Sequence, residues 1–211
     1  MRGRKKTNCS TTVIVFARKP QVGKVKTRLA KNVGAEFASQ IYFTLLQRTI
    51  AQVSKIRQVR KVLMPSNRRH TRWFRRNYSR LGWSVRPQIV GDLGERMEKA
   101  VMFELAQDRS VILIGSDVIG HQAKDIEIVC DWLANGTDVV LGPALDGGYW
   151  LVAMRSEFFN IFRGMRWSQS NVFEVTVERL ERENCRFQLL APRQDVDRAQ
   201  DLLGSGWRGY N

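Results

Sequence analysis

The stretch Val13-Ile-Val-Phe-Ala-Arg-Lys-Pro-Gln-Val-Gly-Lys-Val-Lys-Thr-Arg-Leu29 decides the fold class, because an apolar run leads directly into a cationic loop. Residues 13–17 are short, apolar and mostly β-branched, which is typical of a strand buried on both faces of a sheet. In open α/β sheets, ligands bind beyond the carboxyl ends of the strands. We therefore expect a phosphate-bearing ligand beside the cationic residues of this loop: Arg18, Lys19, Lys24, Lys26 and Arg28.

The rest of the chain alternates apolar runs with amphipathic segments. Further strands are predicted at 59–64, 83–90, 111–115, 138–143, 149–154 and 186–190, with 83–90 at a sheet edge. Helices are predicted at 34–53, 67–81, 91–106, 123–134, 156–162 and 170–183, followed by a short C-terminal helix. This alternation predicts an α/β sandwich with a mostly parallel sheet, as a single domain over 13–211. Residues 1–12 are expected to form a basic, disordered tail.

Composition narrows the class of protein. The chain has 211 residues and 43% hydrophobic content, which is ample for one packed core. No apolar run approaches the roughly 20 residues that span a bilayer, and no signal-peptide pattern is present, so a cytoplasmic protein is expected. Cys9, Cys130 and Cys185 form no CxxC pair, which favours reduced thiols. His70 and His121 have no cysteine at zinc-ligand spacing, and both are expected at the surface.

The net charge of +15 is unevenly distributed. Residues 1–90 contain 22 lysines and arginines and a single acidic residue, Glu36, whereas residues 91–211 contain 13 basic and 19 acidic residues. One interpretation is a surface for nucleic acid or an anionic membrane. The other is an active site with a cationic half that holds phosphate and an acidic half that holds a metal. The residues alone leave both open.

The first loop is not a P-loop. Arg18 stands where that motif needs its first glycine, and Val25 follows Lys24 where serine or threonine is required. Gly23 still permits a close backbone approach, and the neighbouring cations can meet phosphate oxygens. A solvated basic loop without function is the alternative.

Two aspartates are candidates for chemistry. Asp117 follows the apolar run 111–115, where a carboxylate suits Mg²⁺ or Mn²⁺ bound to a diphosphate, although it could instead cap the next helix. Asp146 precedes two glycines, and a tight turn explains it at least as well as catalysis does. The arginines around Trp73 and Phe74 could contact nucleic acid, but a solvated helix face with inward aromatic rings is the commoner reason for that pattern.

Taken together, the motifs resemble the DUF2064 family of bacterial GT-A-type transferases over about residues 13–203. The resemblance rests on blocks that occur in order: Phe16-Ala-Arg-Lys-Pro20, Gly23-Lys-Val-Lys-Thr-Arg-Leu29, Gly91-Asp-Leu-Gly-Glu-Arg-Met97, Gly115-Ser-Asp117, Leu141-Gly-Pro-Ala-Leu-Asp-Gly-Gly-Tyr149, Trp167-Ser168 and Asp195-Val-Asp197. The cationic segment between Arg57 and Arg86 exceeds the family pattern.

The resemblance implies a three-layer, Rossmann-like nucleotide-diphospho-sugar transferase (GT-A) fold. It implies a nucleotide and phosphate site formed by Ala17, Arg18, Lys19, Gly23, Lys24, Lys26 and Arg28. It further implies a metal site for Mg²⁺ or Mn²⁺ at Asp117 and Asp197, and it makes Asp117, Lys24 and Asp146 the catalytic candidates.

The expected reaction is glycosyl transfer from a nucleotide-diphospho-sugar to an unidentified small-molecule acceptor. The alternative is nucleotidyl transfer, in which an NTP is joined to a phosphorylated acceptor and pyrophosphate is released. A non-catalytic protein that binds anions, nucleic acid or an anionic membrane is a further, less favoured alternative. Fold-level resemblance alone does not choose among these activities.

Overall fold

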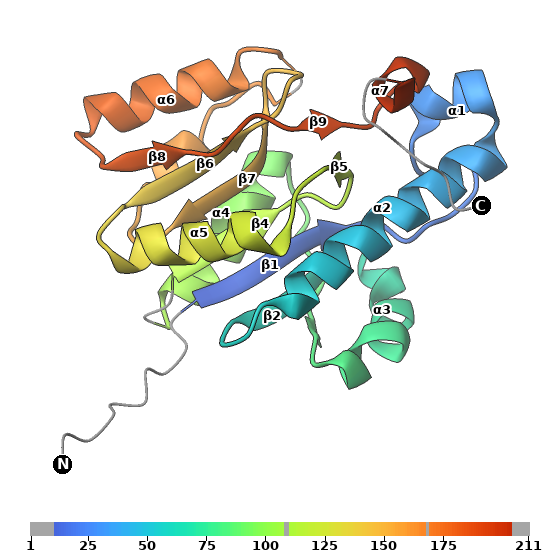
Figure 1. The fold of residues 1–211 in the computed structure, drawn as a ribbon, viewed down its shortest axis with the longest axis horizontal. Coiled ribbons are helices and arrows are strands. Elements are labelled where there is room, and N and C mark those ends of the chain that lie inside the picture. The colour runs from blue at the N-terminus through green and yellow to red at the C-terminus, as the bar shows by residue number, and fades with distance from the viewer. Residues whose placement is uncertain (1–10, 108–109, 168, 204–211) are drawn as a thin grey trace.

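The computed structural model describes residues 11–107, 110–167 and 169–203, so most of the expected tail, Cys9 and Ser168 lie outside the described residues. Helices and strands alternate along the chain around one central sheet (Figure 1). The sheet has seven strands, in the spatial order β3-β2-β1-β4-β7-β6-β8. These strands are β1 (Thr11–Ala17), β2 (Arg60–Pro65), β3 (Ser84–Val85), β4 (Ser110–Ile114), β6 (Val139–Pro143), β7 (Tyr149–Met154) and β8 (Phe187–Leu189).

The helices lie between these strands in the sequence, except α7, which follows the last strand. The α-helices are α1 (Thr27–Val33), α2 (Ala35–Lys55), α3 (Thr71–Tyr78), α4 (Leu93–Leu105), α5 (Ala123–Ala134), α6 (Val172–Arg182) and α7 (Ala199–Leu203). Three single turns of 3₁₀-helix are η1 (Arg68–His70), η2 (Ser79–Leu81) and η3 (Phe159–Ile161). Among the described residues, no helix has the length and apolar character needed to cross a bilayer.

The sheet is mostly parallel, as predicted. β1 pairs in parallel with β2 and β4, β2 with β3, and β6 with β8. β7 runs antiparallel between β4 and β6. The tight turn between β6 and β7 makes them neighbours, which confirms the predicted pairing. Because the other strands run in one direction, their carboxyl ends meet at one edge of the sheet.

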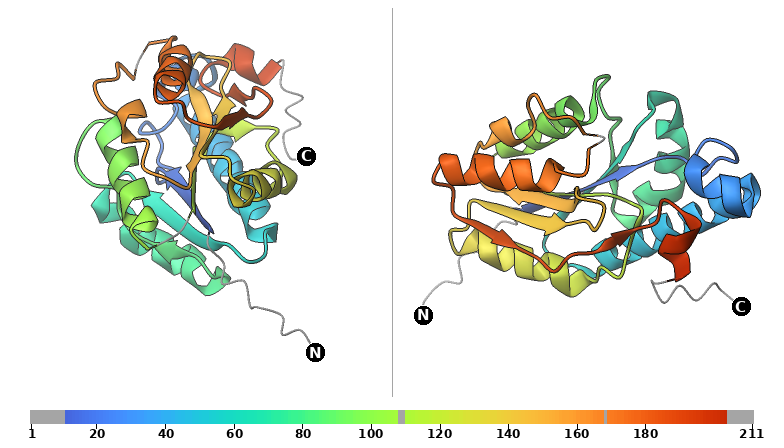
Figure 2. Two further views of the ribbon diagram at one scale, coloured as in Figure 1. Left: turned by 90° about the vertical axis from the view of Figure 1, so that its left-hand side faces the viewer. Right: turned by 90° about the horizontal axis from the view of Figure 1, so that it is seen from above.

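Helices cover both faces of the sheet, which confirms the three-layer α/β architecture (Figure 2). Successive side chains of β1 point to opposite faces, because a strand has a period of two. Val13 and Val15 pack with α2, α3 and α5, whereas Ile14 packs with α4 and α6 on the other face. All three side chains are fully buried. The central strand therefore joins the two halves of the core.

A second, two-stranded sheet was not predicted from the sequence. β5 (Val118–Ile119) pairs antiparallel with β9 (Gln194–Asp195), with Val118 opposite Asp195. The backbone N–H of Val196 also donates to the carbonyl of Asp117 at 3.2 Å. The Val196 side chain is fully buried against α1 and α2. This pairing brings the C-terminal acidic block to the end of β4.

Several element boundaries differ from the prediction. β1 begins at Thr11 rather than residue 13, because Thr12 is buried and donates a hydrogen bond to Glu104 at 2.9 Å. The predicted strand 83–90 reduces to two residues, because Pro87 interrupts it. The predicted helix 156–162 is one 3₁₀ turn, since Gly164, with φ of 58°, redirects the chain too soon for a helix to propagate. The segment 67–81 is divided among η1, α3 and η2.

Candidate active site

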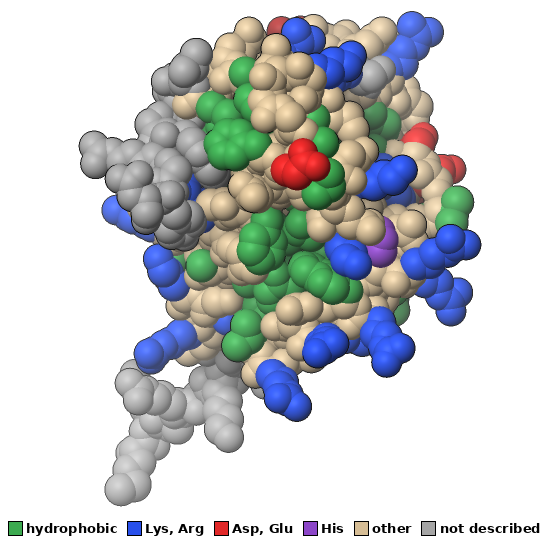
Figure 3. Space-filling view, turned by 90° about the vertical axis from the view of Figure 1, so that its right-hand side faces the viewer, with side chains coloured by type: hydrophobic (Ala, Val, Ile, Leu, Met, Phe, Trp, Pro, Cys, Tyr) green, Lys and Arg blue, Asp and Glu red, His purple; other side chains and the backbone are tan. Residues whose placement is uncertain are grey.

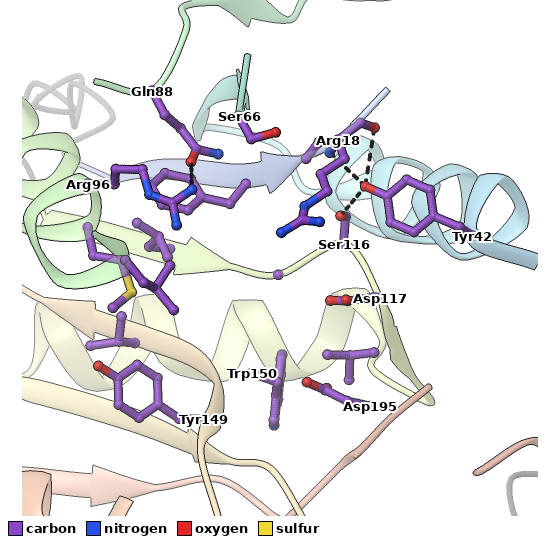
Figure 4. Close-up of a pocket in the computed structure, with 18 residues that line it drawn as sticks. Arg18, Tyr42, Ser66, Gln88, Arg96, Ser116, Asp117, Tyr149, Trp150 and Asp195 are labelled. Carbon is purple, nitrogen blue, oxygen red and sulfur yellow. Dashed lines mark hydrogen bonds between the residues drawn. The ribbon is translucent and has the colours of Figure 1, made fainter. Parts of the chain in front are cut away.

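A cavity of about 280 Å³ opens at the carboxyl ends of β1 and β4 (Figure 4). Its polar part is lined by side chains that follow these strands, including Arg18, Ser116 and Asp117, together with Asp195 from β9. Its apolar part is lined by Phe16, Leu93, Met97, Leu113, Tyr149 and Val152. Charged groups and a water-excluding wall thus meet in one place, as in many small-molecule sites.

Tyr42 of α2 joins the two loops that form the polar part. Its side chain is 2% exposed, and its hydroxyl oxygen accepts the Arg18 backbone N–H at 2.7 Å. The hydroxyl also lies 3.2 Å from the Arg18 carbonyl oxygen and 2.9 Å from the Ser116 hydroxyl (Figure 4). Burial raises the pKa of Tyr42 to about 12, so the hydroxyl keeps its proton at neutral pH. The sequence showed Tyr42 only as part of an apolar helix face.

The cationic loop divides between two cavities. Ala17 and Arg18 line the larger cavity, and Arg18, Lys26 and Arg28 line an adjoining cavity of about 210 Å³. The other predicted phosphate residues, Lys19, Gly23 and Lys24, line neither. The ammonium group of Lys19 instead lies 5.9 Å from the centre of the Trp73 ring. The structure therefore brings together only part of the predicted phosphate site.

The predicted cationic and acidic halves of the site contact each other directly. Lys26 adopts a left-handed backbone conformation before α1, and its Nζ lies 2.7 Å from Asp117 Oδ2. The Lys26 side chain is only 7% exposed, whereas the Asp117 side chain is 36% exposed, so the lysine is shielded from bulk water and the carboxylate still faces the cavities. Arg28 makes a second, exposed pair with Asp197 at 2.9 Å. Each predicted metal ligand thus has a cation of the first loop as its partner.

Asp117 lines both cavities and does not cap a helix. The next helix, α5, begins at Ala123 with Gln122 as its N-cap, which excludes the capping alternative. Asp117 and Asp197 share the smaller cavity, whereas Asp117 and Asp195 share the larger one. Among the described residues, no group of three or more histidine, cysteine, aspartate or glutamate side chains is arranged to hold a metal ion.

Asp195 is a site residue that the sequence did not single out. Burial, followed by the charges of Asp117 and Asp146, raises the pKa of Asp195 to about 8. Its Oδ1 is buried and has no hydrogen-bond partner among the described residues. In the sequence, the two aspartates Asp195 and Asp197 after a short strand could have indicated an acidic site. Only the pairing of β9 with β5 shows which of the two lines the larger cavity.

Asp146 lies in the turn between β6 and β7 and lines neither cavity. Its Oδ1 accepts the Gly148 backbone N–H at 3.0 Å, which supports the turn interpretation. Gly147, with φ of 89°, lies so close to the segment that precedes α6 that an added Cβ would clash with the Ser170 carbonyl group. A general-base role for Asp146 stays a prediction.

Gln88 and Arg96 form a further wall of the larger cavity. Arg96 donates to the Gln88 side-chain oxygen at 2.9 Å (Figure 4). Gln88 donates in turn to the Met64 carbonyl at 2.7 Å. Arg96 belongs to α4, which begins with a capping box formed by Asp92 and Glu95. The predicted helix 91–106 agrees with α4, but the cavity positions of Gln88, which precedes the helix, and Arg96, in its first turn, were not predicted.

Comparisons with known proteins agree with this architecture. The family model described as "Uncharacterized protein conserved in bacteria (DUF2064)" matches residues 49–169. A sequence search of curated proteins found no significant match. The structure of a proposed nucleotide-diphospho-sugar transferase from Desulfovibrio desulfuricans G20 is similar, with a TM-score of 0.84 and 28% identity, over 92% of this chain and 84% of that chain.

More distant solved structures share the fold. CMP:2-keto-3-deoxy-manno-octonic acid synthetase in complex with CTP has a TM-score of 0.53 at 11% identity, over 92% of this chain and 95% of that one. A cytidylyltransferase from Leptospira borgpetersenii serovar Hardjo-bovis (strain JB197) has a TM-score of 0.56 at 14% identity, over 89% and 78% of the two chains. At these identities the likeness concerns the fold alone. The chain belongs to the DUF2064 family and has the Rossmann-like, GT-A-type fold of nucleotide-diphospho-sugar transferases.

Proposed function

We propose that this protein is a transferase that takes a glycosyl group from a nucleotide-diphospho-sugar. The observation that carries the proposal is the meeting of Arg18, Asp117 and Asp195 in one cavity at the carboxyl ends of β1 and β4. This is where an open α/β sheet binds its ligands. The transferase named in the comparison with Desulfovibrio desulfuricans, similar over nearly the whole chain, supports the same activity.

The donor set fits a divalent cation. The Asp195 Oδ1 is buried and has no hydrogen-bond partner within the described ranges, and the neighbouring charge of Asp117 has the same sign, so an added cation would relieve both conditions. Carboxylate oxygens are also the ligands that Mg²⁺ and Mn²⁺ prefer. Asp117 and Asp195 would hold the ion, and Asp197 is the alternative second ligand. When bound, the ion would supply Lewis-acid stabilisation of the diphosphate.

The side chains of the protein have separate roles in this proposal. Arg18 and Lys26 would meet the negative charge that grows on the diphosphate as the bond to the sugar breaks. Tyr42 positions Arg18 through both backbone groups of that residue. The apolar wall with Met97 and Tyr149 would exclude water, which strengthens these charge interactions and limits hydrolysis of the donor.

Nucleotidyl transfer is the second candidate. Lys26 and Arg28 line a small cavity next to the one that contains Arg18, which would suit a pyrophosphate leaving group. Product analysis separates the two reactions, because glycosyl transfer releases a nucleoside diphosphate and nucleotidyl transfer releases pyrophosphate.

A thermal-shift screen of nucleotide sugars and NTPs, with and without Mg²⁺, tests the proposal. A ligand at about 100 times its Kd adds about 2.7 kcal/mol of stability, which corresponds to a rise of about 5–10 °C for a chain of this size. Asp117→Asn should abolish the metal-dependent part of the shift, measured against the melting temperature of the same variant without ligand. Asp131→Asn, on the exposed side of α5, is the matched control. The transferase assignment is wrong if no nucleotide stabilises the protein.

A further inference from the structure

An arginine-rich groove of about 1200 Å³ adjoins the candidate active site. We call it the arginine groove; it is lined by Ser66, Asn67, Thr71, Pro87, Gln88, Ile89, Val90 and Gly91 and by the basic residues Arg68, Arg69, Arg72, Arg75 and Arg96. None of the described residues that line it is acidic. Figure 3 shows the side of the molecule that carries α1 and α3, where many lysine and arginine side chains lie around a central group of hydrophobic side chains.

Three of these arginines are not needed for an ion pair in the described part of the fold. Arg68, Arg69 and Arg72 are exposed, and within the described part of the chain none of them forms an ion pair. Like charges gathered in a concave surface repel one another, so the arrangement destabilises the protein unless an anion occupies it. The planar guanidinium groups are suited to paired hydrogen bonds with phosphate oxygens.

The groove adjoins the cavity of the candidate active site. Ser66, Gln88 and Arg96 line both. A hydrogen bond of 2.9 Å from Arg96 to Gln88 holds these two shared side chains together. A phosphate group in the groove would therefore lie beside the cavity that contains Asp117.

The lining disfavours nucleic acid as the occupant. Single strands are bound by stacking their bases on aromatic rings, and no aromatic side chain lines the arginine groove among the described residues. Phe74 of α3 is fully buried, and Trp73 packs against it edge-on at 4.9 Å. Both rings are thus used by the core of the protein, as the alternative interpretation of this segment predicted.

We propose that the arginine groove binds the phosphate group of the second substrate, so that the acceptor is a phosphorylated small molecule. This inference rests on the proposed transferase function, because it assigns the groove to the acceptor of that reaction. It also gives the excess of positive charge between Arg57 and Arg86 a role.

Calorimetric titration with inorganic tripolyphosphate, on the full chain in EDTA, tests the groove separately from any metal. Arg68→Gln/Arg72→Gln should weaken binding about tenfold or more, since two charge-assisted contacts are removed. Arg76→Gln/Arg80→Gln removes the same charge from exposed residues of the same segment that do not line the groove. This control should change the Kd less than about threefold, through long-range charge alone. Equal losses in both double variants, or no loss in either, would overturn the proposal.

A second titration distinguishes the acceptor from the donor site. Tripolyphosphate should still bind when the protein is saturated with whichever nucleotide raises its melting temperature, and competitive displacement would reject the acceptor assignment. If no nucleotide raises the melting temperature, the transferase proposal fails, and with it the acceptor role, even where the arginine groove binds tripolyphosphate. Binding of duplex DNA or anionic vesicles that depends on Arg68 and Arg72, without binding of tripolyphosphate, would show a macromolecular partner instead.

Discussion

Tyr42→Phe is the substitution that most directly tests how the candidate site is held together. It removes one oxygen atom and keeps the buried ring, so it leaves no large cavity in the core. The lost hydroxyl contacts both backbone groups of Arg18 and the side chain of Ser116. Ser116 is only 4% exposed, so water does not readily replace the missing partner.

The expected loss follows from these contacts. Leaving buried groups without partners costs about 1–3 kcal/mol, which lowers the melting temperature by about 2–12 °C for a chain of this size. Arg18 would also be less well positioned for a phosphate. Each 1 kcal/mol of lost positioning weakens nucleotide binding by about fivefold, so an increase in Kd of that order is expected.

Urea denaturation and nucleotide titration measure the two effects. Tyr78→Phe is the matched control, because Tyr78 is also buried but its hydroxyl accepts a hydrogen bond from the Gln47 side chain, at 3.1 Å, and does not contact the site. The control should lose less stability and bind nucleotide as the unaltered protein does. If both variants bind nucleotide equally well, Tyr42 does not position the site and the reasoning is refuted.

Three further predictions concern stability. Glu104→Gln should cost about 3–5 kcal/mol in urea denaturation, because Glu104 is fully buried with two arginine partners. Glu98→Gln on the same helix, whose partner is exposed, should cost less than about 1 kcal/mol, and equal losses would contradict this. Gly147→Ala should unfold far more readily than Gly164→Ala, since both have positive φ but only Gly147 lacks room for a Cβ; similar melting temperatures would argue against this packing. Burial lowers the pKa of His121 below its ordinary value of 6.5. As the pH falls below 6.5, the unfolded chain therefore binds a proton before the folded protein does, and the free energy of unfolding should decrease. If the free energy of unfolding of His121→Gln depends on pH in the same way, His121 is not the cause.

The prediction that His121 lies at the surface is wrong. Its ring packs 5.8 Å from that of Trp150, and 7% of the residue is exposed. The spacing of histidines in a sequence excludes a zinc set, but it says little about burial. Here burial depends on the packing of the β5 segment against β7, which is a long-range feature.

The main sheet could be predicted because its strands are apolar and bounded by turn residues. The β1 run has no polar side chain between Val13 and Ala17, and β4 is similar, so both indicate strands buried on two faces. The β5 and β9 strands have two residues each, which is too short for any hydrophobic period. The register that joins Val118 to Asp195 exists only in the folded chain.

The site was predictable where a residue directly follows a strand. Arg18 follows β1 and Asp117 lies just beyond β4, and parallel strands bring such positions together. The prediction was weaker for Lys24, because a loop sequence does not show which of its cations turn inward. Tyr42 and Asp195 were missed because their roles come from contacts across the fold rather than from a motif.

The central position of β1 has a consequence for the making of the protein. β1 is synthesised before the other strands of the sheet. One of its two neighbours, β4, pairs with it from Ser110, which lies opposite Thr11 and is about a hundred residues further along the chain. At about 5–20 residues per second, the ribosome needs on the order of 5–20 s to supply that partner. Throughout this interval one edge of an apolar strand stays unpaired. Nascent chains stalled before β4 should therefore be the species most prone to aggregate and to bind chaperones.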